Sequence, residues 1–274
     1  MARKTKSKIM LITGAASGIG AATARLAVEA GHKVVIADIN EAGALDVATS
    51  IGPNASAQRL DICSQDDWRI ALDRIWDAHG RLDVLINNAA IVHTGFAADV
   101  SVERHRHTME TNFMGAATGM LAALARFKKQ GSGHLVTIAS MNAFLPFPGI
   151  ASYAAAKHAL RAFHHAVAIE ERQSPVDFTI VYPTATETPM LAKEAGDDAM
   201  ALAFAGNPVT PELVAGVILD AIAKKALEAY IPPERAKFVR AIGVKPKSLR
   251  QMYERNEIIG AEKLKARRTA TRPD

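Results

Sequence analysis

Residues 8–30 read KIMLITGAASGIGAATARLAVEA: a short apolar run, a glycine-rich turn and an alanine-rich stretch with helical spacing. The glycines Gly14, Gly18 and Gly20 follow the first predicted strand and open the first predicted helix. Such a turn lets backbone amides approach a pyrophosphate, and the helix N-terminus adds a partial positive charge. The spacing is G-x3-G-x-G rather than the commoner G-x-G-x-x-G, and a packing role for the glycines is the competing interpretation.

The chain continues to alternate apolar runs with helical stretches up to residue 231. Several of the apolar runs are uninterrupted, which is typical of strands that helices cover on both faces. The alternation predicts an α/β fold, a Rossmann-like doubly wound parallel sheet of about seven strands. The predicted strands are 8–13, 33–38, 56–61, 82–87, 134–140, 177–182 and 228–231, and the predicted helices are 18–30, 41–51, 64–79, 101–129, 152–173 and 210–225.

The pattern changes after residue 231, so we expect a Rossmann-type domain over 1–231 and a basic helical C-terminal extension over 232–274. Apolar residues at 3- and 4-residue spacings predict an amphipathic helix in the extension, broken near Gly243 and Pro246. Docking on its own subunit or a neighbour is favoured, because the apolar stripe needs cover. Peripheral attachment to an anionic membrane surface and a solvated tail are the alternatives.

The net charge of +5 is unevenly distributed over the 274 residues. Residues 1–8 carry +4 and residues 232–274 carry +7, so residues 9–231 carry −6. Because no recognition motif accompanies the basic ends, no nucleic-acid partner is expected. The composition, 49% hydrophobic and 22% charged, excludes a disordered chain and a histone-like polycation.

The single cysteine, Cys63, excludes an internal disulfide and a cysteine zinc site and fits a reducing compartment. No apolar run approaches the ~18 residues of a membrane span, so the expected location is the cytoplasm. The histidine pairs His105/His107 and His164/His165 do not face each other on a helix, and no carboxylate pattern accompanies them. Surface or interface positions are expected for them, and no metal site.

Asp38 ends the second predicted strand, where a carboxylate can bind both ribose hydroxyls of an adenosine. It would repel a 2′-phosphate, and the nearby Ser17, Ile39 and Asn40 offer no compensating cation. These residues favour NAD over NADP as the cofactor. A solvated aspartate at the strand end is the alternative interpretation.

Tyr153 and Lys157 are four residues apart in a predicted helix, so their side chains share one face. A tyrosine with a pKa near 10 transfers protons poorly at pH 7, and a nearby ammonium would lower that pKa. The pair alone is weak evidence, because it arises by chance in about one chain of five.

With other motifs in the same order, this pair resembles the short-chain dehydrogenase/reductase family over about residues 8–231. Ser140 precedes Tyr153 by 13 residues, the spacing of that family's active site. The resemblance implies an oxidoreductase that moves a hydride between NAD(H) and a secondary alcohol or ketone. The motifs are Thr13-Gly14-x3-Gly18-Ile19-Gly20, Asp38, Asp61, Asn87-Asn88-Ala89-Ala90, Asn112, Ser140, Tyr153-x3-Lys157 and Pro183 with Thr188.

The resemblance also implies roles for these residues. Tyr153 would be the general acid/base, Ser140 would bind the same substrate oxygen, and Lys157 would lower the tyrosine pKa and hold the nicotinamide ribose. Asn112 would anchor a water that links Lys157 to solvent. The alternative is that its side chain only bends the helix. The cofactor-binding residues would be Gly14, Ser17, Gly18, Ile19, Gly20, Asp38, Ile39, Asp61, Ile62, Asn88, Ala89, Ala90, Tyr153, Lys157, Pro183, Thr184 and Thr188.

One position departs from the family pattern, because Thr184 stands where glycine usually follows Pro183. Its Cβ and hydroxyl would narrow the nicotinamide side of the pocket or restrict the φ angle of the loop. This departure affects the expected pose of the cofactor and leaves the reaction class unchanged.

The residues expected around the substrate are apolar or aromatic and short of cations, which favours a hydrophobic alcohol or ketone over an acid or a sugar phosphate. Core positions for several of them are the alternative. The segment 189–208 suits a mobile helical lid. The expected lining residues are Ile91, Val92, His93, residues 141–150, Met190, Leu191, Met200 and Phe204.

Two other functions compete with an NAD-dependent dehydrogenase. Asp38 argues against an NADPH-dependent reductase of the 3-oxoacyl or another carbonyl type. The intact set of catalytic residues argues against a non-catalytic NAD-binding scaffold. The helices over 101–129 and 152–173 pair between subunits in the family, so a homodimer or homotetramer is expected.

Overall fold

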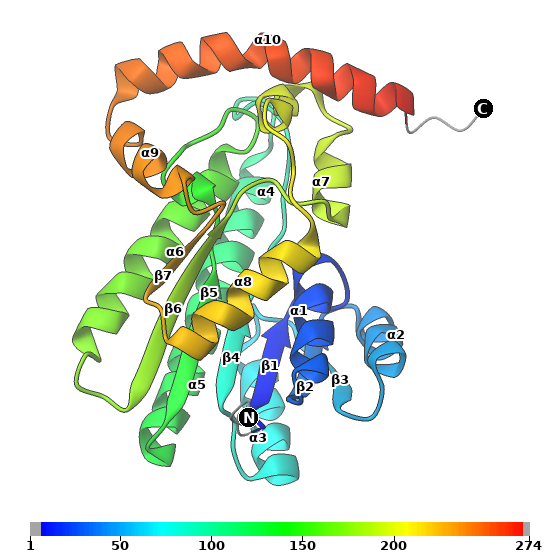
Figure 1. The fold of residues 1–274 in the computed structure, drawn as a ribbon, viewed down its shortest axis with the longest axis vertical. Coiled ribbons are helices and arrows are strands. Elements are labelled where there is room, and N and C mark those ends of the chain that lie inside the picture. The colour runs from blue at the N-terminus through cyan, green and yellow to red at the C-terminus, as the bar shows by residue number, and fades with distance from the viewer. Residues whose placement is uncertain (1–6, 271–274) are drawn as a thin grey trace, which may run out of the picture.

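The computed structural model describes residues 7–270, whose central feature is a parallel sheet with helices on both faces (Figure 1). The strand order β3-β2-β1-β4-β5-β6-β7 confirms the predicted doubly wound topology and all seven predicted strands. The bounds differ from the expected ones by at most two residues. The strands are β1 (Ile9–Thr13), β2 (Lys33–Asp38), β3 (Ala55–Arg59), β4 (Val84–Asn87), β5 (Gly133–Ile138), β6 (Val176–Pro183) and β7 (Glu228–Ile231).

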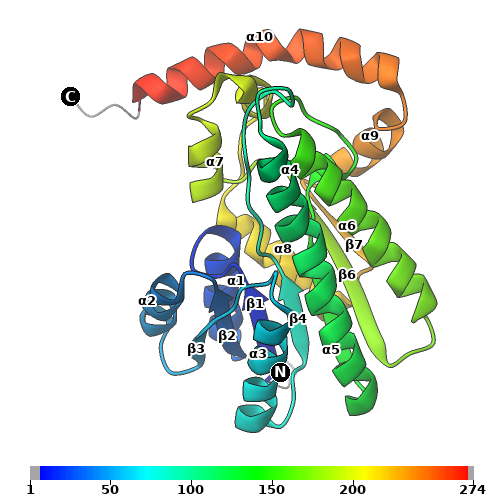
Figure 2. The same ribbon diagram turned by 180° about the vertical axis from the view of Figure 1, so that it is seen from behind.

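Two layers of helices enclose the sheet, as the views from front and back show (Figures 1 and 2). The predicted helix over 101–129 is interrupted by a π-helical turn, η1 (Glu110–Gly115). One layer consists of α1 (Gly18–Glu29), α2 (Glu41–Ile51) and α8 (Pro211–Lys224), and the other includes α3 (Gln65–His79), α4 (Val102–Met109), α5 (Ala116–Gln130) and α6 (Ala151–Glu170).

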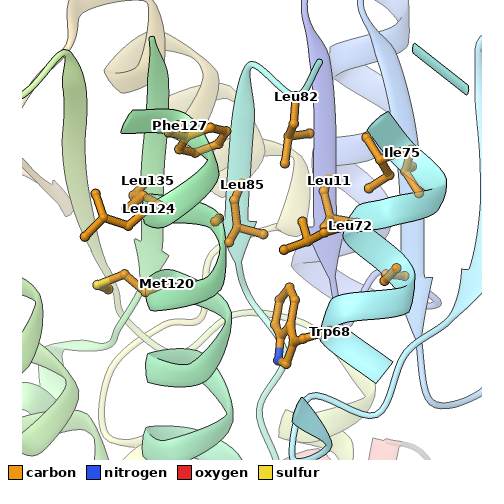
Figure 3. Close-up of a cluster of buried hydrophobic side chains, with 14 of the residues drawn as sticks. Leu11, Trp68, Leu72, Ile75, Leu82, Leu85, Met120, Leu124, Phe127 and Leu135 are labelled. Atoms are coloured by element: carbon orange, nitrogen blue, oxygen red, sulfur yellow. The ribbon is translucent and has the colours of Figure 1, made fainter. Parts of the chain in front are cut away.

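Successive residues of β1 supply two separate cores. Ile9 and Leu11 pack with α3 and α5, whereas Met10 and Ile12 pack with α1, α2 and α8. All five residues of β1 are buried, which explains why the strand reads as an unbroken apolar run. Figure 3 shows the first core, where Trp68 and neighbouring side chains of α3 face the sheet beside α5.

Glycines in two helices differ in the space available to a side chain. A Cβ at Gly119 of α5 would lie 2.2 Å from the Trp68 ring, so α5 and α3 require glycine there. Gly216 of α8 is exposed and has no atom within 4 Å of an added Cβ.

We therefore expect Gly216→Ala to raise the free energy of unfolding by about 0.5–1 kcal/mol, because alanine restricts the unfolded chain more and suits a helix better. Urea denaturation followed by circular dichroism measures the change. Gly119→Ala is the matched control and should destabilise the protein through overpacking. A loss of stability in Gly216→Ala would contradict the prediction.

Two helices follow β7: α9 (Arg235–Ile242) and α10 (Pro246–Ala270), with the predicted break between them. α10 crosses the molecule beyond the carboxyl ends of the strands (Figure 1). It packs on the 3₁₀-helix η3 (Asp198–Phe204), where Gly260 meets the backbone of Ala201. The extension therefore docks on its own chain, as the favoured interpretation expected. Residues 1–6 of the basic N-terminal segment and residues 271–274 lie outside the described residues.

One histidine of α6, His164, differs from its expected surface position. His164 is buried, its Nδ1 lies 2.9 Å from the Thr137 hydroxyl, and burial lowers its pKa to about 3. The expectation is therefore wrong for His164, which belongs to the core. Across residues 7–270, no helix has the length and apolar character needed to cross a bilayer.

Candidate active site

The glycine turn lies where the direction of strand order changes, between β1 and β4. Asn88, just after β4, donates from Nδ2 to the carbonyl oxygens of Thr13 (2.9 Å) and Gly14 (3.0 Å). The two neighbouring strands are thereby tied together at their carboxyl ends. In open α/β sheets this switch point is where ligands bind.

The turn requires glycine at its predicted positions. Gly14 and Gly18 have φ angles of +63° and +56°, and a Cβ on Gly14 would lie 2.6 Å from the Ala89 Cα. A Cβ on Gly20 would lie 2.5 Å from the Gly14 oxygen. Ser17 is the N-cap of α1, but its side chain makes no capping hydrogen bond. The turn has no bulky side chains at its glycines, and the first N–H groups of α1 have no side-chain cap. Both features fit the binding of a dinucleotide pyrophosphate.

Asp38 lies at the end of β2, beside the glycine turn. Its Oδ2 accepts a hydrogen bond from the Ala16 amide and its Oδ1 from the Asn40 amide, each at 3.0 Å. These bonds hold the carboxylate at the rim of the crevice. Ile39, exposed over 62% of its surface, lies beside it.

The predicted catalytic residues Ser140, Tyr153 and Lys157 come together from α6 and the segment that follows β5. Tyr153 and Lys157 share one face of α6, and Lys157 Nζ lies 5.6 Å from the centre of the Tyr153 ring. Lys157 Nζ also donates to the Ile138 carbonyl at 2.9 Å, which fixes α6 against the end of β5. Ser140, two residues further along, hydrogen-bonds with the Tyr153 hydroxyl.

The pKa of Tyr153 is raised, which is opposite to the direction expected from Lys157 alone. Burial is the largest cause, the nearby Glu194 carboxylate acts in the same direction, and the hydrogen bond with Ser140 acts against both. Burial also lowers the pKa of Lys157 to about 8. The sequence reveals the shared helix face but not this degree of burial, which depends on the elements that cover it.

Asn112 lies in the π-helical turn η1 and is fully buried. Its Nδ2 donates to the Ile91 carbonyl and its Oδ1 accepts from the Ile91 amide, both at 2.8 Å. The side chain therefore joins η1 to the loop after β4. π-Turns are rare and often occur at functional sites.

One cavity of about 1620 Å³ joins most of the predicted cofactor-binding and catalytic residues. Gly20 and Asn112 are absent from its lining, since both are packed behind it. Thr188 lines it as the N-cap of α7 (Pro189–Glu194). The predicted residues that line the cavity are Gly14, Ser17, Gly18, Ile19, Asp38, Ile39, Asp61, Ile62, Asn88, Ala89, Ala90, Ser140, Tyr153, Lys157, Pro183, Thr184 and Thr188.

The substrate side of the cavity differs from its predicted lining. Val92, Met200 and Phe204 belong instead to a buried cluster that Leu264 of α10 completes. His93 is also absent from the lining, and its Nδ1 lies 2.9 Å from the Thr108 hydroxyl. Of the predicted residues, those that line the cavity are Ile91, Met141, Asn142, Leu145, Phe147, Ile150, Met190 and Leu191.

Several lining residues were not predicted. Side chains of α4 and α9 add cations, so the expectation of a lining short of cations is wrong. The helical spacing of the C-terminal extension was recognised, but a one-dimensional pattern does not reveal which surface an extension covers. The unpredicted lining residues include Cys63, His105, Arg106, His107, Glu194, Arg235, Phe238, Val239, Met252, Tyr253 and Asn256.

Thr184, the departure from the family pattern, connects the cavity to this extension. Its hydroxyl accepts a hydrogen bond from Arg235 of α9 at 3.2 Å, and its amide donates to the Ile231 carbonyl at 3.0 Å. A glycine could not make the first of these contacts.

Comparison with known proteins gives the family. Residues 8–199 match the model of the short chain dehydrogenase family. A 2,5-dichloro-2,5-cyclohexadiene-1,4-diol dehydrogenase, LinX, from Sphingobium indicum is 36% identical over 72% of this chain and 80% of its own. A 3-beta-hydroxysteroid dehydrogenase from Comamonas testosteroni is 29% identical over 80% of this chain and 90% of its own.

A solved structure supports the same fold. It is a short chain dehydrogenase/reductase from Burkholderia phymatum in complex with NAD, with a TM-score of 0.80 and 24% identity. The match covers 87% of this chain and 93% of that one. The chain therefore belongs to the short-chain dehydrogenase/reductase family, whose members oxidise alcohols or reduce ketones with NAD(P).

Proposed function

We propose that the protein is an NAD-dependent dehydrogenase of hydrophobic secondary alcohols, with Tyr153 as the general acid/base. The observation that carries this proposal is the single cavity, in which Tyr153, Ser140 and Lys157 share a lining with the glycine turn and Asp38. Both relatives named above are dehydrogenases of cyclic alcohols by name, which supports the substrate class.

The chemistry follows from the positions of the side chains. A bound nicotinamide supplies the carbon that accepts the hydride. Tyr153 takes the proton from the alcohol, and Ser140 holds the same oxygen as its charge changes. Lys157, with a pKa of about 8, is mostly protonated at pH 7, so its ammonium favours the phenolate of Tyr153 in the step where the tyrosine loses its proton.

The preference for NAD rests on Asp38, whose carboxylate would lie close to a 2′-phosphate. We expect Asp38→Ser to lower the preference for NAD over NADP, as the ratio of kcat/KM values, by about 100-fold, equivalent to about 2.7 kcal/mol. Steady-state kinetics with both cofactors measures this ratio. Asp46→Ser on the exposed face of α2 is the matched control. An unchanged ratio in Asp38→Ser would place cofactor selection elsewhere.

A panel of cyclic, steroidal and linear secondary alcohols tests the substrate class. With NAD⁺ present, absorbance of the reduced cofactor reports turnover, and the corresponding ketones with NADH test the reverse direction. We expect cyclic secondary alcohols to be better substrates than linear ones. Binding of NADH without turnover of any alcohol or ketone would favour the non-catalytic scaffold instead.

A further inference from the structure

Glu194 is a carboxylate within the active-site cavity that the reaction described above does not use. It is the last residue of α7 and lines the cavity together with Tyr153 and Ser140. Its influence on the pKa of Tyr153 shows that the two side chains are close enough to interact electrostatically. Met190 and Leu191 of the same helix, two residues expected around the substrate, line the cavity as well.

The Glu194 carboxylate has no hydrogen-bond or ion-pair partner among residues 7–270. The adjacent Lys193 instead donates to the Val92 carbonyl at 3.0 Å. On α10, Arg267 binds Glu187 through two hydrogen bonds, of 2.8 and 2.6 Å, and Arg268 binds Asp198 at 2.5 Å. These two arginines of α10 thus bind carboxylates other than that of Glu194.

A carboxylate that is withdrawn from water without a hydrogen-bond partner costs free energy, and a ligand that supplies a hydrogen-bond donor offsets this cost. Glu194 is half-buried, and this burial raises the pKa of its carboxyl to about 7. A ligand donor would remove this cost, and the energy gained would then contribute to binding.

The other charged residues that line the cavity have both signs: Arg106, Lys157 and Arg235 are basic, and Asp38, Asp61 and Glu110 are acidic. Because these three basic and three acidic residues balance, the lining has no strong preference for a cation, and a neutral hydroxyl can serve as the donor. The substrate's reacting hydroxyl is occupied by Tyr153 and Ser140, so the donor must be a second group.

We propose that Glu194 accepts a hydrogen bond from a second hydroxyl of the substrate, so that the enzyme selects diols over simple secondary alcohols. This inference rests on the proposed dehydrogenase function. It assigns to Glu194 the role of a specificity-determining residue, distinct from the proton transfer at Tyr153.

The test compares cyclohexanol with the 1,2-, 1,3- and 1,4-cyclohexanediols, using the full-length enzyme with NAD⁺. We expect kcat/KM for the best diol to exceed that for cyclohexanol by about tenfold, and Glu194→Leu to abolish this preference. Glu194→Gln should retain part of it, because its amide oxygen still accepts a hydrogen bond. Asp198→Asn is the matched control and should keep the full preference, because Asp198 of η3 is a nearby carboxylate in the sequence that does not line the cavity.

Calorimetric titration of the NADH-loaded enzyme with the same alcohols gives a second readout that does not need turnover. Binding of a diol that weakens in Glu194→Leu supports the inference even if no alcohol is oxidised, in which case the proposed function fails alone. Turnover with equal diol preference in wild type and Glu194→Leu overturns the inference alone. Tighter binding of 4-aminocyclohexanol than of every diol would also overturn it, in favour of a cationic group.

Discussion

Tyr153→Phe is expected to lower kcat by about 10²–10⁴-fold, while the Kd for NADH changes by less than about twofold. The substitution removes the oxygen that we propose exchanges a proton with the substrate, and it keeps the aromatic ring on α6. Lys157 retains its hydrogen bond to Ile138, and the glycine turn, which lies at the end of β1, is unaffected. Single-turnover kinetics and fluorescence titration with NADH measure the two quantities separately.

Tyr230→Phe provides the matched control for this result. It also loses a hydroxyl, but Tyr230 lies outside the cavity, where its hydroxyl bonds with Glu228 and Arg240. We expect its kcat to stay close to that of the wild type. Substantial turnover in Tyr153→Phe would contradict the assignment of Tyr153 as the general acid/base, and a parallel loss of NADH binding would show that the tyrosine has a structural role.

Local sequence patterns were sufficient for the sheet and for the cofactor side of the cavity. The strand β1 is an apolar run whose side chains alternate between two cores, as Ile9 and Met10 show, so a few residues are enough to predict it. The glycine turn is equally local, because the positive φ angles of Gly14 and Gly18 and the close approach of Ala89 require glycine. Parallel strands then bring the end of β4 beside that turn.

The substrate side could not be predicted in the same way, because its lining comes from segments far apart in the chain. Met200 and Phe204 have the same apolar character as Met190, yet they point into a core that Leu264 closes from 60 or more residues away. The environment of Glu194 likewise depends on which cations of α10 bind other carboxylates. Residue type does not distinguish these cases without the tertiary contacts.

The contact between α10 and η3 therefore leads to a second large effect. A Cβ at Gly260 would lie 2.0 Å from the Ala201 carbonyl oxygen and 2.7 Å from its carbon. Both obstacles are backbone atoms, so a larger residue must move one segment away from the other. We expect Gly260→Leu to separate α10 from η3 locally and to displace the wall that Met252, Tyr253 and Asn256 form.

Because these three residues line the substrate side, the KM for the alcohol in Gly260→Leu should rise by about tenfold or more, equivalent to about 1.4 kcal/mol. The Kd for NADH should remain nearly unchanged. Ala261→Leu adds the same side chain at the neighbouring exposed position of α10 and is the matched control for KM. Circular dichroism establishes that both variants fold. A wild-type KM in folded Gly260→Leu would show that the C-terminal extension covers the cavity without contributing to substrate binding. A raised KM would show that the extension forms part of the wall that holds the substrate.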